Sequence, residues 1–154
     1  MTYVMIKVLH VLSSTVLFGT GIGSAWYFLL ASLDAEPRVI ARVAHWVVLA
    51  DALFTATTAI VQPVTGWWMA KTTGFAFTHG WLAVSIVLYA IAIATWLPVV
   101  ALQIRMRDIA RAAANANQTL PPAFRGCLIA WIALGVIAFF AFVGIFYLMI
   151  AKPF

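Results

Sequence analysis

Long apolar runs alternate with short polar or charged segments along the chain. Four runs are long enough for a helix that crosses about 30 Å of hydrocarbon, which takes about 20 residues. They cover residues 8–33, 43–70, part of 72–104 and 126–151. The segments between them hold the turn and charge signals SLDAEPR (32–38), KTTGFAFTHG (71–80) and RMRDIARAAANANQTLPPAFR (105–125). This pattern predicts helices over about 3–33, 40–70, 80–111 and 123–151.

Composition assigns these helices to a membrane. Of the 154 residues, 66% are hydrophobic and 8% are charged, whereas a soluble domain has roughly 25% charged residues. Short connections favour antiparallel neighbours, so we predict an all-α integral membrane protein with one transmembrane domain over residues 1–154, an up-down-up-down four-helix bundle. The first run is too long for a cleaved signal peptide. Cys127 stands alone, which excludes an intramolecular disulfide and a thiol-cluster metal site.

The positive charges predict how the chain is oriented. The net charge is +5, but no basic run is dense enough for nucleic acid. The first and third connections and their flanks hold Arg38, Arg42, Arg105, Arg107, Arg111 and Arg125. The opposite side holds Lys7, Lys71 and Lys152. Because arginine and lysine are retained on the cytoplasmic side, both termini are expected to face outward.

Two other patterns concern depth and packing. Aromatic residues are expected to form belts at the two interfaces. The outer belt would hold Trp67, Trp68 and Trp81, and the inner belt Trp26, Tyr27 and Trp46. Gly19 and Gly23 form a G-x-x-x-G pattern, which predicts close packing of the first helix against a neighbour.

Polar residues recur at helical spacing inside three of the four runs. The first carries Tyr3, Lys7, His10 and Ser14; the second Asp51, Thr55, Thr58, Gln62 and Thr65, followed by Met69; the third Trp81, Ser85, Tyr89, Trp96 and Gln103. Lipid offers these groups no hydrogen-bond partner, so each stripe should face the bundle interior. The interior is therefore a candidate binding cavity or proton path.

Asp51 is expected near mid-membrane. An ionised aspartate there costs about 2.5–3.5 kcal/mol on insertion scales. It is either a neutral, hydrogen-bonded packing residue or a proton-relay or ligand-contact residue. Pro63 should free the backbone carbonyl of Ala59 at the same stripe, which either shapes a cavity or leaves a simple kink.

His10 is the strongest candidate ligand, because it is too deep to reach water without a cavity. His45 is expected on the inner side and His79 at the outer mouth of the third helix, so no two histidines face each other at one depth. A bis-histidine haem is therefore not predicted. A single-histidine haem, or His10 paired with Lys7, Met69 or Tyr89, remains open.

Thioethers and imidazoles also suit Cu(I). The outer half holds Met1, Met5, Met69 and Met149 together with His10 and His79. Methionine is equally an ordinary filler of apolar helices, so copper is kept as the alternative cofactor.

Several segments resemble known families. IKVLHVLSSTVLFGTGIGSAWY and VTGWWM…HGWLAVSIVLY are similar to the first helix and to the second and third helix ends of the HemJ/CopD-like four-helix membrane proteins. HemJ is the bacterial haem-b-containing protoporphyrinogen oxidase. Over nearly its whole length the chain more closely resembles a family of bacterial predicted integral membrane proteins, domain of unknown function 2269. Its matching segments are QPVTGWWM, LYAIAIATWLPVVALQIRMRDIA and IFYLMIAKP.

The HemJ resemblance implies haem ligation by His10, a functional role for Lys7 and a bacterial inner-membrane location. The chain departs from HemJ at Leu17, where HemJ has tryptophan, at Trp26, where it has arginine, and at Ser85, where it has lysine. The resemblance therefore carries the fold and the haem, and not the porphyrinogen chemistry.

Three functional hypotheses follow. The first is a redox protein with haem b in the outer half and a quinone or another redox membrane protein as partner. The second is a copper-handling or transport protein of CopD type that uses His10, Met5 and Met69. The third is a non-catalytic subunit or scaffold. Whether the chain is an enzyme or forms a homo-oligomer stays open. The candidate catalytic residues are Asp51 and Lys7, and the candidate cofactor-binding residues are Lys7, His10, Ser14, Gln62, Met69 and Tyr89.

Overall fold

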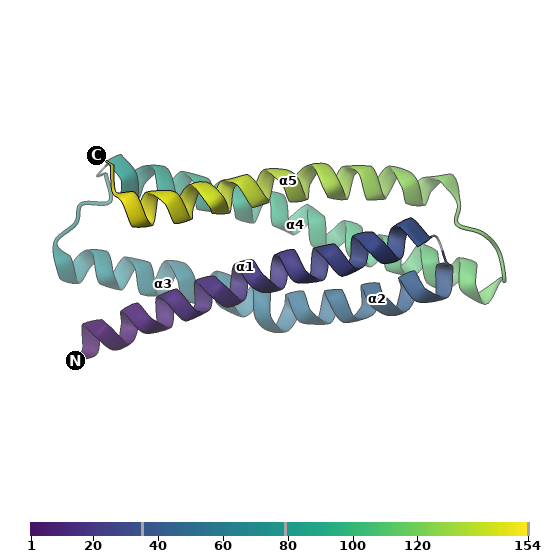
Figure 1. Cartoon of the computed structure of the whole chain (residues 1–154), viewed down its shortest axis with the longest axis horizontal. Helices are drawn as coiled ribbons and strands as arrows, with labels where there is room; N and C mark the ends of the chain where they lie inside the picture. Colours follow the sequence, from purple (N-terminus) through teal and green to yellow (C-terminus); the bar gives the residue numbers. More distant parts are fainter. Residues whose placement is uncertain (35, 79, 154) are drawn as a thin grey trace.

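The computed structural model of the chain describes residues 1–34, 36–78 and 80–153. Its elements are α1 (Thr2–Asp34), α2 (Pro37–Ala50), the π-helical turn η1 (Asp51–Thr55), α3 (Ala56–Thr73), α4 (Gly80–Asn115) and α5 (Pro122–Ala151) (Figure 1). Elements α2, η1 and α3 form one continuous span, so that four helices are long and apolar enough to cross a membrane. The described residues contain no strand. This confirms the predicted all-α, four-helix membrane bundle.

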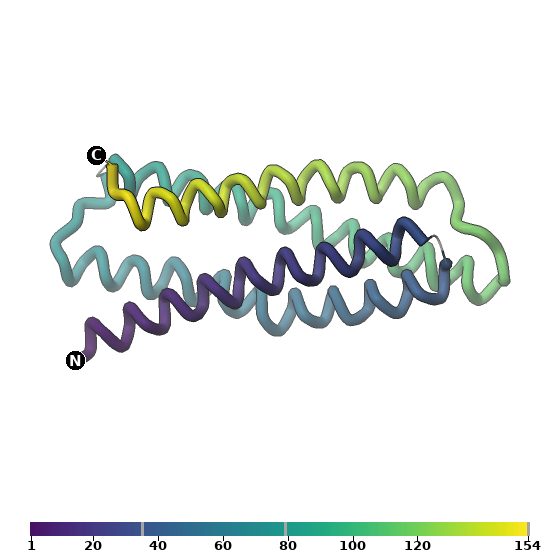
Figure 2. Tube along the Cα trace, in the orientation of Figure 1, coloured from purple at the N-terminus to yellow at the C-terminus, as the bar shows by residue number. Residues whose placement is uncertain are grey.

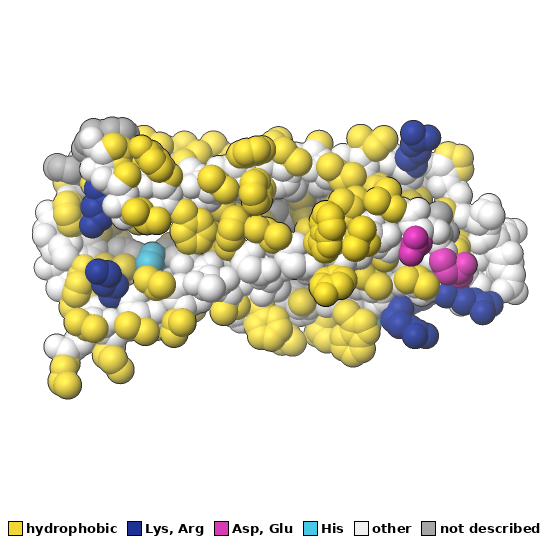
Figure 3. Space-filling view, in the orientation of Figure 1, with side chains coloured by type: hydrophobic (Ala, Val, Ile, Leu, Met, Phe, Trp, Pro, Cys, Tyr) yellow, Lys and Arg dark blue, Asp and Glu magenta, His cyan; other side chains and the backbone are white. Residues whose placement is uncertain are grey.

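The two ends of the bundle differ in what they hold. Both termini and the connection between α3 and α4 lie at one end, which we call the terminal end (Figures 1 and 2). The other end holds the α1–α2 and α4–α5 connections together with Arg38, Arg42 and Arg111, and we call it the arginine end. Apolar side chains cover the face between the two ends, where lysine and arginine are absent from view (Figure 3). Such a surface suits contact with lipid.

The dense core lies toward the arginine end. Phe28, Ile40 and Met106 are fully buried there, from α1, α2 and α4. The ring of Phe28 meets Trp131 of α5 edge-on, with 5.2 Å between centroids. Helix α4 packs mainly against α5 and α2, and α1 packs against α3 and α2, but α1 and α5 have few contacts. The bundle is therefore two helix pairs joined tightly at one end and parted along the α1–α5 seam.

The ends of the helices follow local rules. Pro37 occupies the first turn of α2, and the Glu36 side chain accepts the backbone N–H of Arg38. Gly74 ends α3 with φ +74°, the left-handed conformation that glycine adopts without a Cβ clash. Pro122 opens α5 after the extended residue Pro121.

Pro63 frees the carbonyl oxygen of Ala59 as predicted, but this oxygen does not remain open. The Tyr89 hydroxyl of α4 donates a hydrogen bond to it. In hydrocarbon an unpaired carbonyl costs free energy, so the tyrosine offsets the bond that the proline removes. It also ties α4 to α3, two helices that otherwise have few contacts.

Two predictions about packing and depth are corrected. Trp26, Tyr27, Trp46 and Trp67 are exposed as belt residues should be. Trp81 is wrong as a belt residue, because its side chain is only 7% exposed, packs on Phe75 and lies beneath Lys152, whose Nζ is 5.4 Å from the ring centroid. The predicted packing role of Gly19 and Gly23 is also wrong within this chain, because a Cβ at either position would meet nothing within 4 Å.

The Tyr89–Ala59 bond should be coupled to Pro63. We expect Tyr89→Phe to lower the free energy of unfolding by about 1 kcal/mol, since buried hydrogen bonds in membrane helices contribute about that much. In a Pro63→Ala background the new backbone N–H can bond Ala59, so the effect of Tyr89→Phe should be markedly smaller. Unfolding in mixed detergent micelles with increasing sodium dodecyl sulfate measures the free energy of unfolding of the wild type, the two single variants and the double variant. An equal effect in both backgrounds would contradict the coupling.

Candidate functional site

A polar network in the terminal half joins α1 to α3. Gln62 is buried, and its Nε2 donates to the backbone oxygen of His10 at 2.7 Å and to Ser13 Oγ at 2.6 Å. The Ser13 hydroxyl also donates to the His10 oxygen at 3.1 Å. The predicted stripes of the first and second spans thus meet, and one amide side chain satisfies groups on both helices.

The His10 imidazole is held by the same face of α3. Its Nδ1 lies 2.7 Å from Thr65 Oγ1, and the Thr65 hydroxyl itself donates to the Val61 oxygen at 2.7 Å. Because that proton is committed, Thr65 accepts from Nδ1–H, an assignment made from the hydrogen-bond pattern. A Cβ on Gly66 would stand 3.4 Å from His10 Cε1, so the glycine leaves room for the ring. In the neutral tautomer this leaves the lone pair of Nε2 as the free coordinating position.

The other residues predicted beside His10 are exposed, half-buried or hydrogen-bonded to other groups. Lys7 is exposed, and no described acidic side chain forms an ion pair with it. Ser14 donates to the Val11 oxygen of its own helix, and Met69 is half-buried on α3. Tyr89 bonds Ala59, as described above. Among the described candidate cofactor residues, Gln62 is therefore the one that forms a hydrogen bond with His10, through the His10 backbone oxygen.

The remaining histidines add no ligand to this site. His45 is exposed on α2 and contacts Trp46 edge-on. His79 lies outside the described residues. Among the residues that the structure describes, no three His, Cys, Asp or Glu side chains gather as a metal-binding group. Figure 3 shows a histidine side chain in a recess near the terminal end, flanked by basic side chains.

A cavity of about 450 Å³ lies deeper, toward the middle of the bundle. All four spans contribute to its wall. The residues that matter below are Phe18 and Gly21 of α1, Asp51 and Thr55 of η1, Trp96 and Gln103 of α4, and Trp131, Gly135, Phe139 and Phe142 of α5. Exposed side chains from both α1 and α5, including Trp26 and Phe140, stand at its rim. The cavity therefore opens sideways through the seam between these two helices, toward lipid.

Asp51 lies in the wall of this cavity, at the start of the π-helical turn. Its side chain is 4% exposed, and the Thr55 hydroxyl donates to Oδ1 at 2.8 Å. Gln103 of α4 is 2% exposed and lines the same cavity. π-Helical turns are rare and are frequent at functional sites. The turn brings Asp51 and Thr55 to one face, where α4 supplies the third polar group.

Three polar atoms around this cavity have no hydrogen-bond partner among the described residues. They are Trp96 Nε1, Gln103 Oε1 and Trp131 Nε1, and all three are buried. Few buried polar groups in native proteins stay unpaired, and hydrocarbon supplies no water for them. The residues that carry these two donors and one acceptor all line the cavity, so these groups are the candidates for hydrogen bonds to a guest molecule.

The apolar walls leave space where side chains are usually found. A Cβ on Gly21 or on Gly135 would meet nothing within 4 Å. Phe18 of α1 packs against Phe139, Phe142 and Phe146 of α5, with centroid separations of 5.8, 6.1 and 5.2 Å. The cavity thus combines open glycine surface with aromatic walls, which suits a flat apolar guest.

Sequence reasoning predicted Asp51 and the faces of Trp96 and Gln103, but it missed the contribution of α5. Trp131, Gly135 and Phe139 recur at steps of four residues, and Phe142 follows three later. This stripe is apolar apart from one indole N–H, so it did not stand out in a helix that is apolar all round.

The fold and these sites define a small four-helix integral membrane protein. Residues 4–153 match the family described as predicted integral membrane protein (DUF2269), and the chain belongs to that family. Neither curated proteins nor solved structures gave a match.

The α1–α3 network should contribute to stability. We expect Gln62→Leu to lower the free energy of unfolding by roughly 1–2 kcal/mol, because it removes two interhelical hydrogen bonds and leaves the Ser13 hydroxyl without the donor that bonds it. Thr58→Val is the matched control, since the Thr58 hydroxyl donates only to carbonyls of its own helix turn, those of Phe54 and Thr55. Detergent unfolding of both variants checks this. A larger loss for Thr58→Val would contradict the assignment.

Proposed function

We propose that this protein binds a lipid-soluble quinone in the cavity between its two helix pairs. The observation that carries the proposal is the set of three unpaired buried polar atoms, Trp96 Nε1, Gln103 Oε1 and Trp131 Nε1, around one membrane-depth cavity with aromatic walls.

The chemistry of a quinone headgroup suits this set. A quinone carries two carbonyl acceptors on a flat ring, and Trp96 and Trp131 supply two indole N–H donors from different helices. The reduced quinol carries hydroxyl donors, for which Gln103 Oε1 is an acceptor. The phenylalanines that join α1 to α5 offer faces for stacking. Asp51 lines the same cavity and is the candidate group for proton exchange with a bound headgroup.

Access also suits a lipid-soluble molecule. The cavity opens through the α1–α5 seam, where the two helices have few contacts. An isoprenoid tail can then remain in the bilayer while the headgroup lies in the cavity. We place the protein in the bacterial inner membrane with both termini in the periplasm, because the arginine end then faces the cytoplasm.

Quinone binding is tested by filling the cavity. We expect wild-type protein in micelles to bind decylubiquinone, and Gly135→Val to weaken that binding at least tenfold, because the new side chain enters open space in the cavity. Gly126→Val is the matched control, since a Cβ there also meets nothing within 4 Å but the residue does not line the cavity. Native mass spectrometry measures the bound fraction.

The donors are tested separately. Trp131→Phe should weaken decylubiquinone binding about fivefold, the loss of one hydrogen bond, whereas Trp46→Phe, on the exposed face of α2, should not. Absence of binding by the wild type, or equal losses in Gly135→Val and Gly126→Val, would overturn the proposal and favour the scaffold hypothesis.

A second candidate function is haem b binding by His10. The specific observation is that Nδ1 of His10 is bonded to Thr65, which fixes the ring and leaves Nε2 free. Metal-ligating histidines also donate the second ring N–H to an acceptor, usually a carboxylate, a backbone carbonyl or water, and here the Thr65 hydroxyl is that acceptor. The described residues fit one axial imidazole, and Lys7 and Met69 are the candidate partners on α1 and α3. Haem, when bound, supplies an electron-transfer centre.

Copper is less favoured, because Met5 lies five residues, or about 140°, around α1 from His10.

Haem binding has a spectroscopic test. Protein purified from cells supplied with a haem precursor should show a Soret band, and His10→Ala should lose it. His45→Ala, on the far half of the bundle, should keep it. A colourless wild type that stays colourless after added haemin excludes the haem hypothesis without affecting the quinone proposal.

A further inference from the structure

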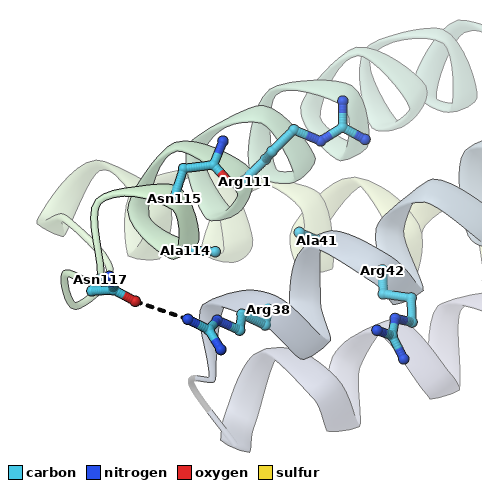
Figure 4. Close-up of a pocket in the computed structure, with 7 residues that line it drawn as sticks. All are labelled: Arg38, Ala41, Arg42, Arg111, Ala114, Asn115 and Asn117. Carbon is cyan, nitrogen blue, oxygen red and sulfur yellow. Dashed lines mark hydrogen bonds between the residues drawn. The ribbon is translucent and has the colours of Figure 1, made fainter.

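A second pocket, of about 480 Å³, lies at the arginine end between α2 and the end of α4. Its lining is Arg38, Ala41, Arg42, Arg111, Ala114, Asn115 and Asn117 (Figure 4). It is built by two spans and the connection that follows α4, so it exists only in the folded protein. It is separate from the mid-membrane cavity, with which it shares no residue.

The charge of this pocket is not neutralised by the protein. No described carboxylate forms an ion pair with Arg38, Arg42 or Arg111, although Arg107 nearby pairs with Asp108 at 2.9 Å. The Glu36 side chain instead accepts the backbone N–H at the start of α2. Three arginines therefore line the pocket, and none of them forms an ion pair with a described carboxylate.

The side chains of the pocket differ in what holds them. Arg38 donates to Asn117 Oδ1 at 2.8 Å, which fixes its guanidinium group at one edge. Figure 4 shows the side chains of Arg42 and Arg111 starting from α2 and α4 on either side of the pocket, with their guanidinium groups pointing in opposite directions. Asn117 has φ +50°, which turns the chain so that its amide faces α2.

The pocket also lies at the depth of the lipid headgroups. Exposed Trp26 and Tyr27 lie in the last third of α1, toward this end, and aromatic side chains of this kind concentrate at the membrane interface. The phosphate of an anionic lipid lies at the same level, and guanidinium groups bind phosphate through paired, charge-assisted hydrogen bonds. We propose that the arginine pocket is a specific binding site for the phosphate group of an anionic phospholipid, which draws Arg42 and Arg111 together between α2 and α4.

The test compares two pairs of arginines on the same side of the membrane. Dioleoylphosphatidylglycerol is titrated into the purified protein in micelles, with dioleoylphosphatidylcholine as the zwitterionic reference, and bound lipid is counted by native mass spectrometry. Arg42→Gln/Arg111→Gln should weaken phosphatidylglycerol binding about tenfold or more. Arg105→Gln/Arg125→Gln removes the same charge outside the pocket and should change binding less than twofold.

A charge-retaining variant and a competition with a soluble phosphate complete the test. Arg42→Lys/Arg111→Lys retains the charge but not the paired geometry. Its affinity for phosphatidylglycerol should fall between those of the wild type and of the glutamine variant, and this lysine variant also controls for misfolding. Equal losses in the two glutamine variants would show diffuse surface attraction and overturn the proposal. Equal binding of the two lipids by the wild type would overturn it as well. Displacement of the lipid by millimolar glycerol 3-phosphate would assign the pocket to a soluble phosphate instead.

Discussion

Hydrocarbon gives a polar group no hydrogen-bond partner, and the arrangement of this protein follows from that constraint. Gln62 spans α1 and α3 because it satisfies Ser13 and the His10 backbone together. Tyr89 reaches α3 because Pro63 leaves the Ala59 oxygen unpaired. Where the protein does not complete this bonding itself, at Trp96, Gln103 and Trp131, it surrounds a cavity. The paired groups hold the bundle together, and the unpaired groups are those on which the quinone proposal rests.

The distribution of packing explains why the cavity lies where it does. Large side chains such as Phe28 and Met106 fill the bundle near the arginine end and hold all four spans. Beyond this core the α1–α3 and α4–α5 pairs are held within themselves rather than to each other. The phenylalanines of α1 and α5 bridge the parted pairs in the wall of the cavity. A densely packed half therefore adjoins a half in which the two pairs are less closely packed, and the cavity lies where the two halves meet.

The three sites occupy three depths, which gives them separable roles. His10 lies in the terminal half, Asp51 and the tryptophans lie centrally, and the arginine pocket lies at the opposite interface. An anionic lipid at the arginine end would hold α2 to α4, the contact on which the dense core depends.

The sequence alone determined the four membrane spans and the residues that avoid lipid, because apolar length and helical spacing are local properties. It placed Asp51, Gln62 and His10 on inward stripes, and it identified Ala59 as the carbonyl that Pro63 frees. Only the tertiary structure decided which stripes meet. The Gln62 side chain bonds the His10 backbone, whereas the Tyr89 hydroxyl bonds the Ala59 backbone. Trp131 and Gly135 complete the cavity from α5, a helix for which no polar stripe was predicted. Partner choice depends on the rotation and separation of whole helices, which the packing of all four spans sets together.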